Sequence, residues 1–343
     1  MVAPSREILG GQYVQAAALL EGLRADGWEA TLLPINPRFP RGLRGLRKVR
    51  YLRTVLNEAL YLASLPAVAK ADVVHVFAAA YWAFLLAAAP ALLAGRLAGK
   101  RVILHYHSGE ADDHLSRWGR ALDPWLSLAH VIVVPSEYLR EVFENYGWPT
   151  RVIPNVVDAG RFQWRERSTL APRFLSNRNL EPHYRVGDTI DAFAEIAARV
   201  PGATLVVAGD GSQRAELRAR ARGLEGVSFL GRVEPEAMPA LYAAADVFLN
   251  ASVIDNQPLS ILEAFACGLP VVSTPTGEIA RMVRDGETGL LVPPRDPRAI
   301  ADAAIRLLAD PALAISISRR AREQLSRYSW TGVRGQWNEV YAS

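Results

Sequence analysis

Cysteine is almost absent from this sequence of 343 residues, in which Cys267 is the only one. A single cysteine excludes an internal disulfide framework and is typical of a reducing compartment. The start of the chain shows no basic segment followed by an apolar core and a small-residue cleavage site, so we recognise no secretory signal. Short-period repeats and low-complexity tracts are absent as well. These absences favour a globular protein of the cytoplasm.

The excess of positive charge is small and lies entirely in the first half of the chain. The formal net charge is +4; residues 1–155 hold 17 Lys and Arg against 13 Asp and Glu, and the remaining residues hold 22 against 22. Seven of these cations form a run with no acid among them: Arg38, Arg41, Arg44, Arg47, Lys48, Arg50 and Arg53. One segment therefore makes the protein basic.

The basic run predicts an amphipathic helix, because residues about 100° apart on a helix wheel separate into two faces. The apolar face holds Leu46, Val49, Leu52, Leu56 and Leu60, with Arg53 as an exception inside it, and the other side holds Arg44, Arg47, Lys48 and Arg50. Such a helix suits the headgroup region of an anionic membrane or an acidic acceptor. It equally suits a helix that packs on the core and has a solvated basic face.

Residues 73–95 form a long apolar stretch that only His75 interrupts, and it is long enough to cross a bilayer. Its pattern argues against a membrane span. V-V-H-V-F is typical of a strand, residues 78–81 of a turn, and residues 83–97 of a buried helix that contains Pro90. We therefore predict a strand that leads into a helix.

Short β-branched segments alternate with helical patterns along the whole chain. Strands are predicted at residues 1–3, 31–33, 72–77, 101–105, 131–135, 151–153, 173–176, 204–209, 227–230, 246–250, 270–273 and 289–292. Helices are predicted between them, for example at residues 12–25, 189–198, 258–267 and 297–308. Repeated βα units imply parallel sheets that are covered on both faces.

The polar, arginine-rich segment 157–170 has neither period and divides two Rossmann-like halves of similar size. We therefore expect a first domain at 1–156, a linker at 157–170 and a second domain at 171–330. A C-terminal helix at 331–343, around Trp337, would return to the first domain. Open parallel sheets bind ligands beyond the carboxyl ends of their strands, so two such domains would face a central cleft that closes at the linker.

Two glycine pairs follow predicted strands. Gly10 and Gly11 precede a helix, where amides without a Cβ nearby can approach a phosphate, although such a pair is also ordinary in turns. Gly209 and Gly211, after L-V-V-A, resemble the start of a dinucleotide fingerprint. Its third glycine is missing, so a turn is the better interpretation.

Half of the six histidines lie in H-Y-H-S-G-E-A-D-D-H, after the strand predicted at 101–105. His105 and His107 point to the same face, because strand residues alternate. We favour substrate contact or general-base chemistry by His107. A metal site that includes His105 and His114 is an alternative without a further ligand at a diagnostic spacing, and a loop whose histidines bond the backbone is another.

Glu263 stands within an otherwise apolar helix, where a bare charge is very costly to bury. Pro258 suits the first turn of this helix, so the amides near Leu259 and Ser260 are placed to hold an anion at a strand end. One turn further, Glu263 could accept hydrogen bonds from a vicinal diol such as a ribose, or pair with a buried arginine. Asp255, in the preceding loop, could meet another hydroxylated group.

Several motifs occur together in a recognisable order. They are P-S-E-Y-L-R-E-V-F at 135–143, V-I-P-N-V-V-D at 152–158, V-V-A-G-D-G at 206–211, F-L-G-R-V at 229–233, A-D-V-F-L at 245–249 and D-G-E-T-G-L-L-V at 285–292. Asp255 to Glu263, followed by A-F-A-C-G-L-P-V-V, looks like an E-x7-E segment. Over nearly its whole length the chain thus resembles the retaining, nucleotide-sugar-dependent group 1 (family 4-like) glycosyltransferases of the GT-B fold. That fold is α/β, with two Rossmann-like, doubly wound parallel sheets facing a central cleft.

The resemblance implies a role for each matching residue. Glu263 would hold the donor ribose and Asp255 the transferred sugar, while Arg178 in S-N-R-N-L would neutralise the leaving diphosphate. His107 would lie near the reacting sugar. Further donor-binding positions would be Gly10, Gly11, Arg185, Gly209, Arg232, Val233, Leu259, Ser260 and Ile261. The family typically needs no divalent metal, and the sequence has no D-x-D motif that would contradict this.

Two departures from the family pattern affect this site. The first motif acid is Asp255 instead of glutamate. The lysine that normally follows the motif arginine is replaced within N-R-N-L-E-P-H-Y-R, where His183, Tyr184 and Arg185 stand, and Arg185 could supply its charge. The implied mechanism is front-face displacement, in which the acceptor hydroxyl attacks from the side of the leaving group and the anomeric configuration is retained.

The expected partners are a UDP- or GDP-sugar as co-substrate, with no other cofactor, and a hydroxylated glycan, glycolipid or small-molecule acceptor. The location is the cytoplasm or, through the basic helix, the inner face of the membrane. Three alternatives remain: a GT-B donor-binding protein with weak or no turnover, a metal-dependent hydrolase built on His105, His107 and His114, and nucleic-acid binding through the basic run.

Overall fold

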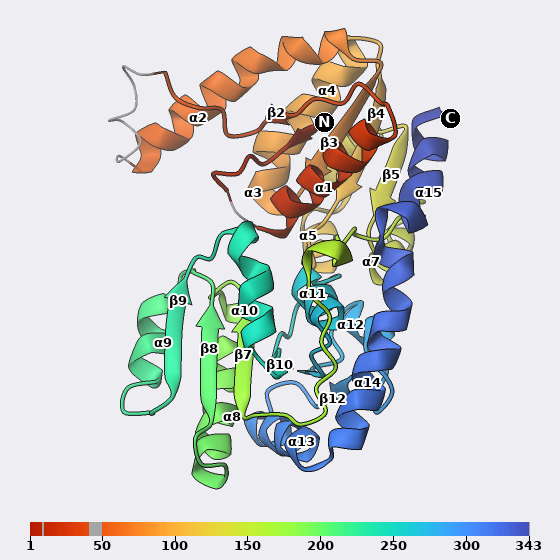
Figure 1. Ribbon diagram of the computed structural model, residues 1–343. Helices are drawn as coiled ribbons and strands as arrows, with labels where there is room; N and C mark the ends of the chain where they lie inside the picture. Colours follow the sequence, from red (N-terminus) through yellow and green to blue (C-terminus); the bar gives the residue numbers. More distant parts are fainter. Residues whose placement is uncertain (9, 41–49, 343) are drawn as a thin grey trace. The chain divides into compact units, whose positions relative to one another are not determined.

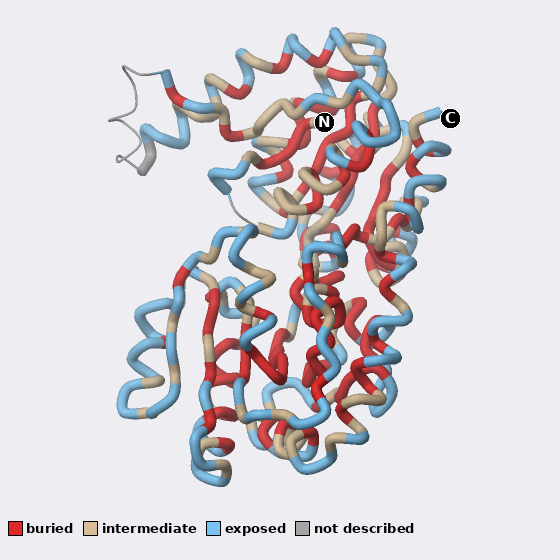
Figure 2. Tube along the Cα trace, in the orientation of Figure 1, coloured by how far each residue is buried: buried red, intermediate tan, exposed pale blue. Residues whose placement is uncertain are grey.

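The computed structural model describes residues 1–8, 10–40 and 50–342. Contacts within the chain divide it into two units, Met1–Val156 with Val333–Ser343, and Val157–Gly332. In each unit the central strands are buried along most of their length (Figure 1, Figure 2). Each unit therefore has its own sheet-centred core.

The first unit contains a parallel sheet of six strands in the order β2-β1-β3-β4-β5-β6. These strands are β1 (Val2–Ala3), β2 (Leu33–Pro34), β3 (Val73–Ala78), β4 (Arg101–Tyr106), β5 (Val131–Val134) and β6 (Arg151–Val152). All but the first residues of β3 and β4 are buried, because both faces of the sheet are covered. The strand order reverses between β1 and β3, which creates a crevice at their carboxyl ends.

The helices of the first unit include α1, which joins β1 to β2, and α15 near the end of the chain. Their bounds are α1 (Gly11–Ala25), α2 (Arg50–Ser64), α3 (Tyr81–Ala83), α4 (Ala89–Leu97), α5 (Ala111–Trp118), α6 (Asp123–Leu126), α7 (Glu137–Asn145) and α15 (Trp330–Ala342). From Val333 onwards α15 belongs to this unit. It is held there by an ion pair between Arg151 and Glu339 and by a hydrogen bond of 3.1 Å from Arg101 Nε to the carbonyl oxygen of Val340.

The second unit contains another parallel sheet of six strands, in the order β12-β11-β10-β7-β8-β9. These strands are β7 (Arg173–Asn177), β8 (Thr204–Ala208), β9 (Val227–Gly231), β10 (Val247–Leu249), β11 (Val271–Ser273) and β12 (Leu290–Leu291). The helices are α8 (Val186–Arg199), α9 (Arg214–Arg220), α10 (Met238–Ala244), α11 (Leu259–Cys267), α12 (Ile279–Met282), α13 (Pro297–Ala309) and α14 (Pro311–Glu323). Here the strand order reverses between β7 and β10.

The arginine-rich segment 157–170 belongs to the second unit. Arg167 is 5% exposed, and its guanidinium donates to the carbonyl oxygens of Ala245 and Cys267 at 2.9 and 2.7 Å. Asp246, which is 1% exposed, forms ion pairs with Arg165, Arg167 and Arg173. A buried charge needs such partners, so these arginines fasten the segment to the start of β10.

The predicted alternation of strands and helices is confirmed. Each of the twelve predicted strands overlaps an observed strand, and the four named helices correspond to α1, α8, α11 and α13. Boundaries differ by a few residues. The helix predicted to begin at Pro258 begins at Leu259, with Pro258 as its N-cap residue.

The apolar stretch 73–95 forms β3 and then a helical segment, as predicted. The helix begins at Tyr81, earlier than expected, and contains a π-helical turn at Phe84–Ala88. Pro90 explains this turn, because its missing N–H and its ring disturb the hydrogen bond to the preceding turn. No helix in the described ranges is both long and apolar enough to cross a membrane.

The predicted basic helix is described only in part. α2 begins at Arg50, so Arg41, Arg44, Leu46, Arg47, Lys48 and Val49 lie outside the described residues. Within α2, Leu56 and Leu60 are half-buried, whereas Leu52, Val55 and Leu62 are exposed. The helix contacts the rest of the unit through Tyr61, whose hydroxyl donates to the carbonyl oxygen of Ala87 at 2.5 Å.

Candidate functional site

The first group of candidate residues lies at the carboxyl ends of β1, β3 and β4. α1 begins at Gly11 without a side-chain cap from Gly10, so its first amides lack that partner. The side chain of Gln12 and the backbone N–H of His107 both donate to the carbonyl oxygen of Ala78, each at 3.0 Å. The amino end of α1 and His107 therefore lie at the same edge of the sheet.

Nothing in the fold itself requires glycine at positions 10 and 11. A Cβ added at either position would meet no heavy atom within 4 Å, and neither residue has a positive φ. The space in front of these two residues is open. A glycine pair at such an uncapped helix start leaves room for a ligand to reach the amides.

His107 follows β4 and stacks on Phe77, with ring centroids 5.0 Å apart and an angle of 9° between the planes. Burial lowers the pKa of His107 to about 3, so its imidazole is neutral at physiological pH. Nε2 of His107 is buried and has no hydrogen-bond partner. A neutral imidazole here can donate or accept one hydrogen bond to a bound sugar.

The histidines after β4 do not form a metal site. His114 lies on α5, where its Nδ1 is 2.9 Å from the hydroxyl of Tyr106. Across the described residues, no group of three or more His, Cys, Asp or Glu side chains is arranged to hold a metal ion. The alternative of a hydrolase built on His105, His107 and His114 therefore lacks the cluster it would need.

The second group lies in the second unit, where the strand order reverses between β7 and β10. Arg178 follows β7, and its guanidinium forms an ion pair with Asp255 and donates to Ser260 Oγ at 3.0 Å. The side chains of Arg178 and Asp255 are only 9% and 8% exposed. Two residues to which the sequence assigned separate roles are thus joined directly, on the carboxyl side of the sheet.

Glycine is required where the loops after β7 and β8 meet. Gly209 has a φ of +133°, and a Cβ there would lie 2.0 Å from the carbonyl oxygen of Arg178. The backbone N–H of Arg178 donates to Ala208 at 3.1 Å, and that of Gly209 donates to Gly231 at 2.8 Å. Gly209 therefore has a packing role, and it links Arg178 to the end of β9, where exposed Arg232 and half-buried Val233 follow.

α11 supplies the remaining candidates. Pro258 provides no side-chain cap, so the amides of Leu259 and Ser260 lack that partner, whereas the N–H of Ile261 donates to the carbonyl oxygen of Pro258 at 3.2 Å. The first two amides are therefore better placed than the third to hold an anion. They begin a helix that is buried along most of its length.

Glu263 is half-buried on α11 and, within the part of the chain that the structure describes, forms no ion pair. Burial raises the pKa of Glu263 to about 7, while the neighbouring hydroxyl of Tyr242 and the charges of Arg161 and Arg178 act in the opposite direction. The alternative of a buried arginine pair is thus not what the structure shows. The pKa of the Glu263 carboxyl therefore lies close to physiological pH, and Tyr242 is its neighbour.

Two family descriptions match the chain. "Glycosyltransferase Family 4" covers residues 9–161, and "Glycosyl transferases group 1" covers residues 171–310. A GDP-mannose-dependent alpha-(1-6)-phosphatidylinositol monomannoside mannosyltransferase of Mycolicibacterium smegmatis is 32% identical over 273 residues, 71% of this chain and 72% of that protein. The chain belongs to the group 1, family 4-like glycosyltransferases.

A second relative and a solved structure extend the comparison. Glycogen synthase of Mycobacterium tuberculosis is 32% identical over 246 residues, and the chain spans 59% of its length, less than two thirds. The crystal structure of Anabaena Alr3699/HepE in complex with UDP-glucose has a TM-score of 0.77 at 20% identity, covering 99% of this chain and 98% of that one. The likeness to HepE confirms the GT-B fold that the sequence predicted.

The sequence assigned no role to two tyrosines near Arg178. Tyr184 lies in the segment where the family lysine is expected. The guanidinium carbon of Arg178 is 4.1 Å from the centre of the Tyr184 ring. Tyr242 accepts a hydrogen bond from Asn177 at 3.0 Å and donates to the carbonyl oxygen of Ser260 at 3.1 Å. The only signal in the sequence was the unusual tyrosine in E-P-H-Y-R.

Arg185, which the sequence offered as a substitute for the lysine, is engaged elsewhere. Its Nε and Nη2 donate to the two carboxylate oxygens of Asp188 at 2.9 and 2.7 Å. Arg185 also adopts a left-handed conformation, with a φ of 50°, at the start of α8. Of His183, Tyr184 and Arg185, the residue that contacts Arg178 is therefore Tyr184, through its uncharged ring.

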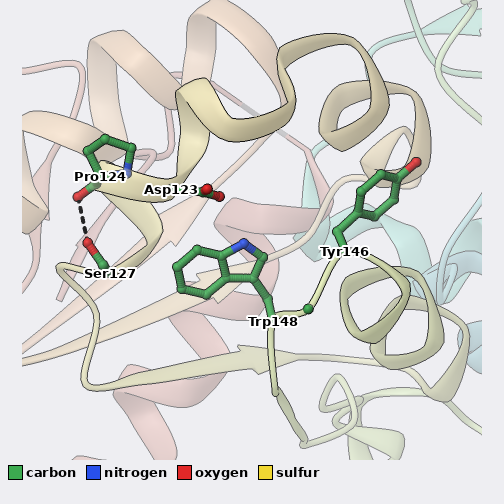
Figure 3. Close-up of a pocket in the computed structure, with 6 residues that line it drawn as sticks. Asp123, Pro124, Ser127, Tyr146 and Trp148 are labelled. Carbon is green, nitrogen blue, oxygen red and sulfur yellow. Dashed lines mark hydrogen bonds between the residues drawn. The ribbon is translucent and has the colours of Figure 1, made fainter.

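A shallow pocket of about 450 Å³ lies elsewhere in the first unit (Figure 3). Its lining residues are Asp123, Pro124, Ser127, Tyr146, Gly147 and Trp148. Ser127 and Trp148 lie in segments that lead into β5 and β6, at the amino-terminal edge of the sheet. The pocket is therefore at the opposite edge from His107 and is not part of the candidate site.

Proposed function

We propose that this protein transfers a sugar from a nucleotide-sugar donor to a hydroxyl acceptor with retention of the anomeric configuration. The observation that carries the proposal is the joining of Arg178, Asp255 and Ser260 beside the uncapped start of α11, at the reversal of strand order. Two similar proteins support a nucleotide-sugar donor: the mycolicibacterial relative is a GDP-mannose-dependent mannosyltransferase, and HepE was crystallised with UDP-glucose. The donor would be a UDP- or GDP-sugar.

The proposed roles follow from charge and position. Arg178 and the amides of Leu259 and Ser260 would stabilise the negative charge that develops on the leaving diphosphate, because fixed cations and dipoles act strongly where water is excluded. Glu263 would accept hydrogen bonds from the ribose hydroxyls, and Asp255 would contact the transferred sugar. This arrangement needs no divalent metal, since the charge is met by protein groups.

The residues of the first unit would serve the other end of the reaction. Gly10 and Gly11 would let the amides of α1 approach the diphosphate, and neutral His107 would bond a hydroxyl of the reacting sugar. The acceptor hydroxyl would attack the anomeric carbon from the face of the departing phosphate. The proton of the acceptor hydroxyl would pass to the phosphate oxygen as the carbon–oxygen bond to the diphosphate breaks. Because the new bond forms on the face that the diphosphate leaves, the anomeric configuration would be retained.

Donor binding can be tested before the acceptor is known. Thermal unfolding would be measured with UDP-glucose, GDP-mannose, an ADP-sugar and a CMP-sugar. A ligand that binds only the folded state at about 100 times its Kd adds about 2.7 kcal/mol of stability. One nucleotide class should raise the unfolding temperature; no shift with any of the four would contradict the proposal.

Turnover is tested with Arg178→Ala and Glu263→Ala. We expect each to abolish most donor hydrolysis or transfer, since each removes a group assigned to the donor. Arg199→Ala and Glu323→Ala are matched controls, because both residues are exposed and lie on helices of the same unit. Transfer near the wild-type rate by either site variant would sink the assignment. The anomeric proton resonance of the first product reports retention or inversion.

A second candidate function is a donor-binding protein with weak turnover. The specific observation in its favour is that, in the segment where the family lysine is missing, Tyr184 contacts Arg178 while Arg185 is bound to Asp188, so one cation fewer would face the diphosphate. Tight donor binding without hydrolysis or transfer would support it. Efficient transfer by the wild-type protein would remove it.

We also propose, as a separate point, that the first unit contacts an anionic membrane surface from the cytoplasm. Exposed apolar residues of α2 and of the neighbouring helical segment 81–97 support this: Val55 is 65% exposed, Trp82 69% and Leu97 80%. Tyr61 joins the two segments through its bond to Ala87. Apolar side chains next to a basic run suit the boundary between headgroups and acyl chains.

A further inference from the structure

A row of side chains crosses the first unit from α15 to His107. The hydroxyl of Tyr341 lies 2.8 Å from Nδ1 of His75, and Nε2 of His75 lies 3.1 Å from Nδ1 of His105. The ring of His105 is in turn 4.0 Å from the ring of His107, between centroids. Three side chains far apart in the sequence thus connect the end of the chain with the candidate sugar-contacting histidine.

This row is enclosed by aromatic rings. His75 and His105 are 1% and 3% exposed, and Trp337 packs against both, with centroids 5.0 and 5.1 Å away. Phe77 stacks on His75 from the other side and also on His107. Burial among such rings disfavours the charged form, so the pKa of each histidine in the row lies well below its ordinary value. All three imidazoles are neutral, and each carries one proton on one nitrogen.

Hydrogen bonding makes the tautomers of these rings depend on one another. If Tyr341 donates to Nδ1 of His75, then Nε2 of His75 carries the proton and donates to Nδ1 of His105. Nε2 of His105 must then carry a proton as well. In the reverse order, Nδ1–H of His105 donates to Nε2 of His75, and Nδ1–H of His75 donates to the oxygen of Tyr341. Nε2 of His105 then holds a lone pair. Whether Nε2 of His105 carries a proton is therefore set by the hydroxyl of Tyr341.

The phenol favours one of these two orders. Burial raises the pKa of Tyr341, so its hydroxyl keeps its proton, and a phenol is a better donor to an imidazole than an acceptor from one. His105 then has an Nε2–H with no hydrogen-bond partner, and Nε2 of His107 is likewise buried without one, in a ring whose centroid is 4.0 Å from that of His105. Buried polar atoms without partners are rare and call for an explanation. Because the two rings are this close, the N–H dipole of His105 acts on His107 and can bias which of its two nitrogens carries the proton.

We propose that Tyr341, His75 and His105 are positioning residues that fix the ring orientation and the Nδ1–H tautomer of His107. His107 would then present one defined donor, Nδ1–H, to a hydroxyl of the reacting sugar. This inference rests on the proposed role of His107 in transfer. The tautomer itself is a property of the free protein and can be measured without any donor.

The first test uses the full chain with ¹⁵N-labelled histidine and long-range ¹H–¹⁵N correlation spectra. In wild-type protein we expect His107 as the Nδ1–H tautomer. Tyr341→Phe keeps the ring and removes the hydroxyl, and should move the His107 nitrogen shifts towards a mixture of tautomers. The matched control is Tyr61→Phe, which removes another buried phenol hydrogen bond of the same unit, to Ala87, without touching the row. The control should leave the His107 shifts unchanged.

The second test is kinetic, with the donor found by thermal shift. We expect Tyr341→Phe to lower kcat about tenfold with little change in the KM for the donor, because it disturbs the geometry of His107 and not donor binding. Tyr61→Phe should keep the wild-type kcat. An unchanged His107 tautomer in both Tyr341→Phe and His75→Phe would overturn the proposal, whatever the activity. If the shifts change while His107→Ala transfers normally, the row is real and the proposed role of His107 fails.

Discussion

The free energy of unfolding should fall as the pH rises because of Glu263, and replacing Glu263 with glutamine should remove this loss. Burial raises the pKa of Glu263 from an ordinary 4.5 to about 7 in the folded protein. Between these two values the native state binds more protons than the unfolded chain, so stability falls as the pH rises through this window and is constant above it. A difference of about 2.5 pKa units corresponds to roughly 3 kcal/mol at pH 8.

Glu263→Gln keeps the size of the side chain and removes its charge. We expect the variant to gain up to about 3 kcal/mol over wild type at pH 8 and less than about 1 kcal/mol at pH 5, where the wild-type carboxyl is mostly protonated in the folded state. Urea unfolding at the two pH values measures the difference. Glu323→Gln, on an exposed turn of α14, is the control and should change stability at neither pH.

A bound donor should stabilise the wild-type protein more than Glu263→Gln, whereas the variant is the more stable of the two without donor. If the carboxylate of Glu263 binds ribose hydroxyls, a saturating nucleotide sugar should stabilise wild-type protein more than Glu263→Gln, because the amide offers the diol only one acceptor oxygen. The reasoning is refuted if Glu263→Gln gains equally at pH 5 and pH 8, or gains nothing at pH 8. Either result would mean that burial does not raise the pKa of the Glu263 carboxyl to about 7.

Other expected outcomes concern the loops and the exposed surface. Tyr184→Ala should lower kcat by up to about thirtyfold, the value of a desolvated cation–π contact of about 2 kcal/mol, whereas Tyr184→Phe keeps the ring and should stay close to wild type in the same steady-state assay; equal effects would rule out stacking as the cause. Gly209→Ala should cost at least about 2 kcal/mol in urea unfolding, because its Cβ would overlap a backbone oxygen at positive φ, whereas Gly11→Ala should leave stability unchanged and weaken donor binding in thermal-shift titrations. Wild-type protein should sediment with anionic but not neutral vesicles at low salt, and replacing Trp82 and Leu97 with serine should reduce this; no binding by wild type would exclude the membrane proposal.

The sheets were predictable from the sequence because buried parallel strands have a strong local signature. β3 and β4 are rich in β-branched residues, and the alternation of strands and helices places the loops after β7 and β10 at one edge of a sheet. The π-turn before Pro90 was not predicted, since the proline alone does not say whether a helix will kink, stop or widen. Local pattern therefore determined the elements and left their irregularities open.

The candidate site was predictable as a set of residues but not as a set of contacts. The joining of Arg178 to Asp255, and the stacking of Tyr184 on Arg178, depend on side-chain directions across loops that are 77 and 6 positions apart. The row from Tyr341 to His107 joins β3, β4 and α15 and has no spacing that a sequence pattern could reveal. Contacts of this kind follow from tertiary packing, which periodicity does not report.

The arginine of the site is held by groups that do not add positive charge. Breaking a buried ion pair leaves an uncompensated charge, so Asp255 fixes Arg178 in place before any donor arrives. A lysine beside Arg178 would bring a second cation and repel it in the empty site, whereas the ring of Tyr184 attracts it. Under the proposed roles, this chain exchanges one diphosphate-binding cation for a firmer placement of the other. If Arg178 binds the diphosphate as proposed, stabilisation of the leaving group depends mainly on Arg178 and on the first amides of α11.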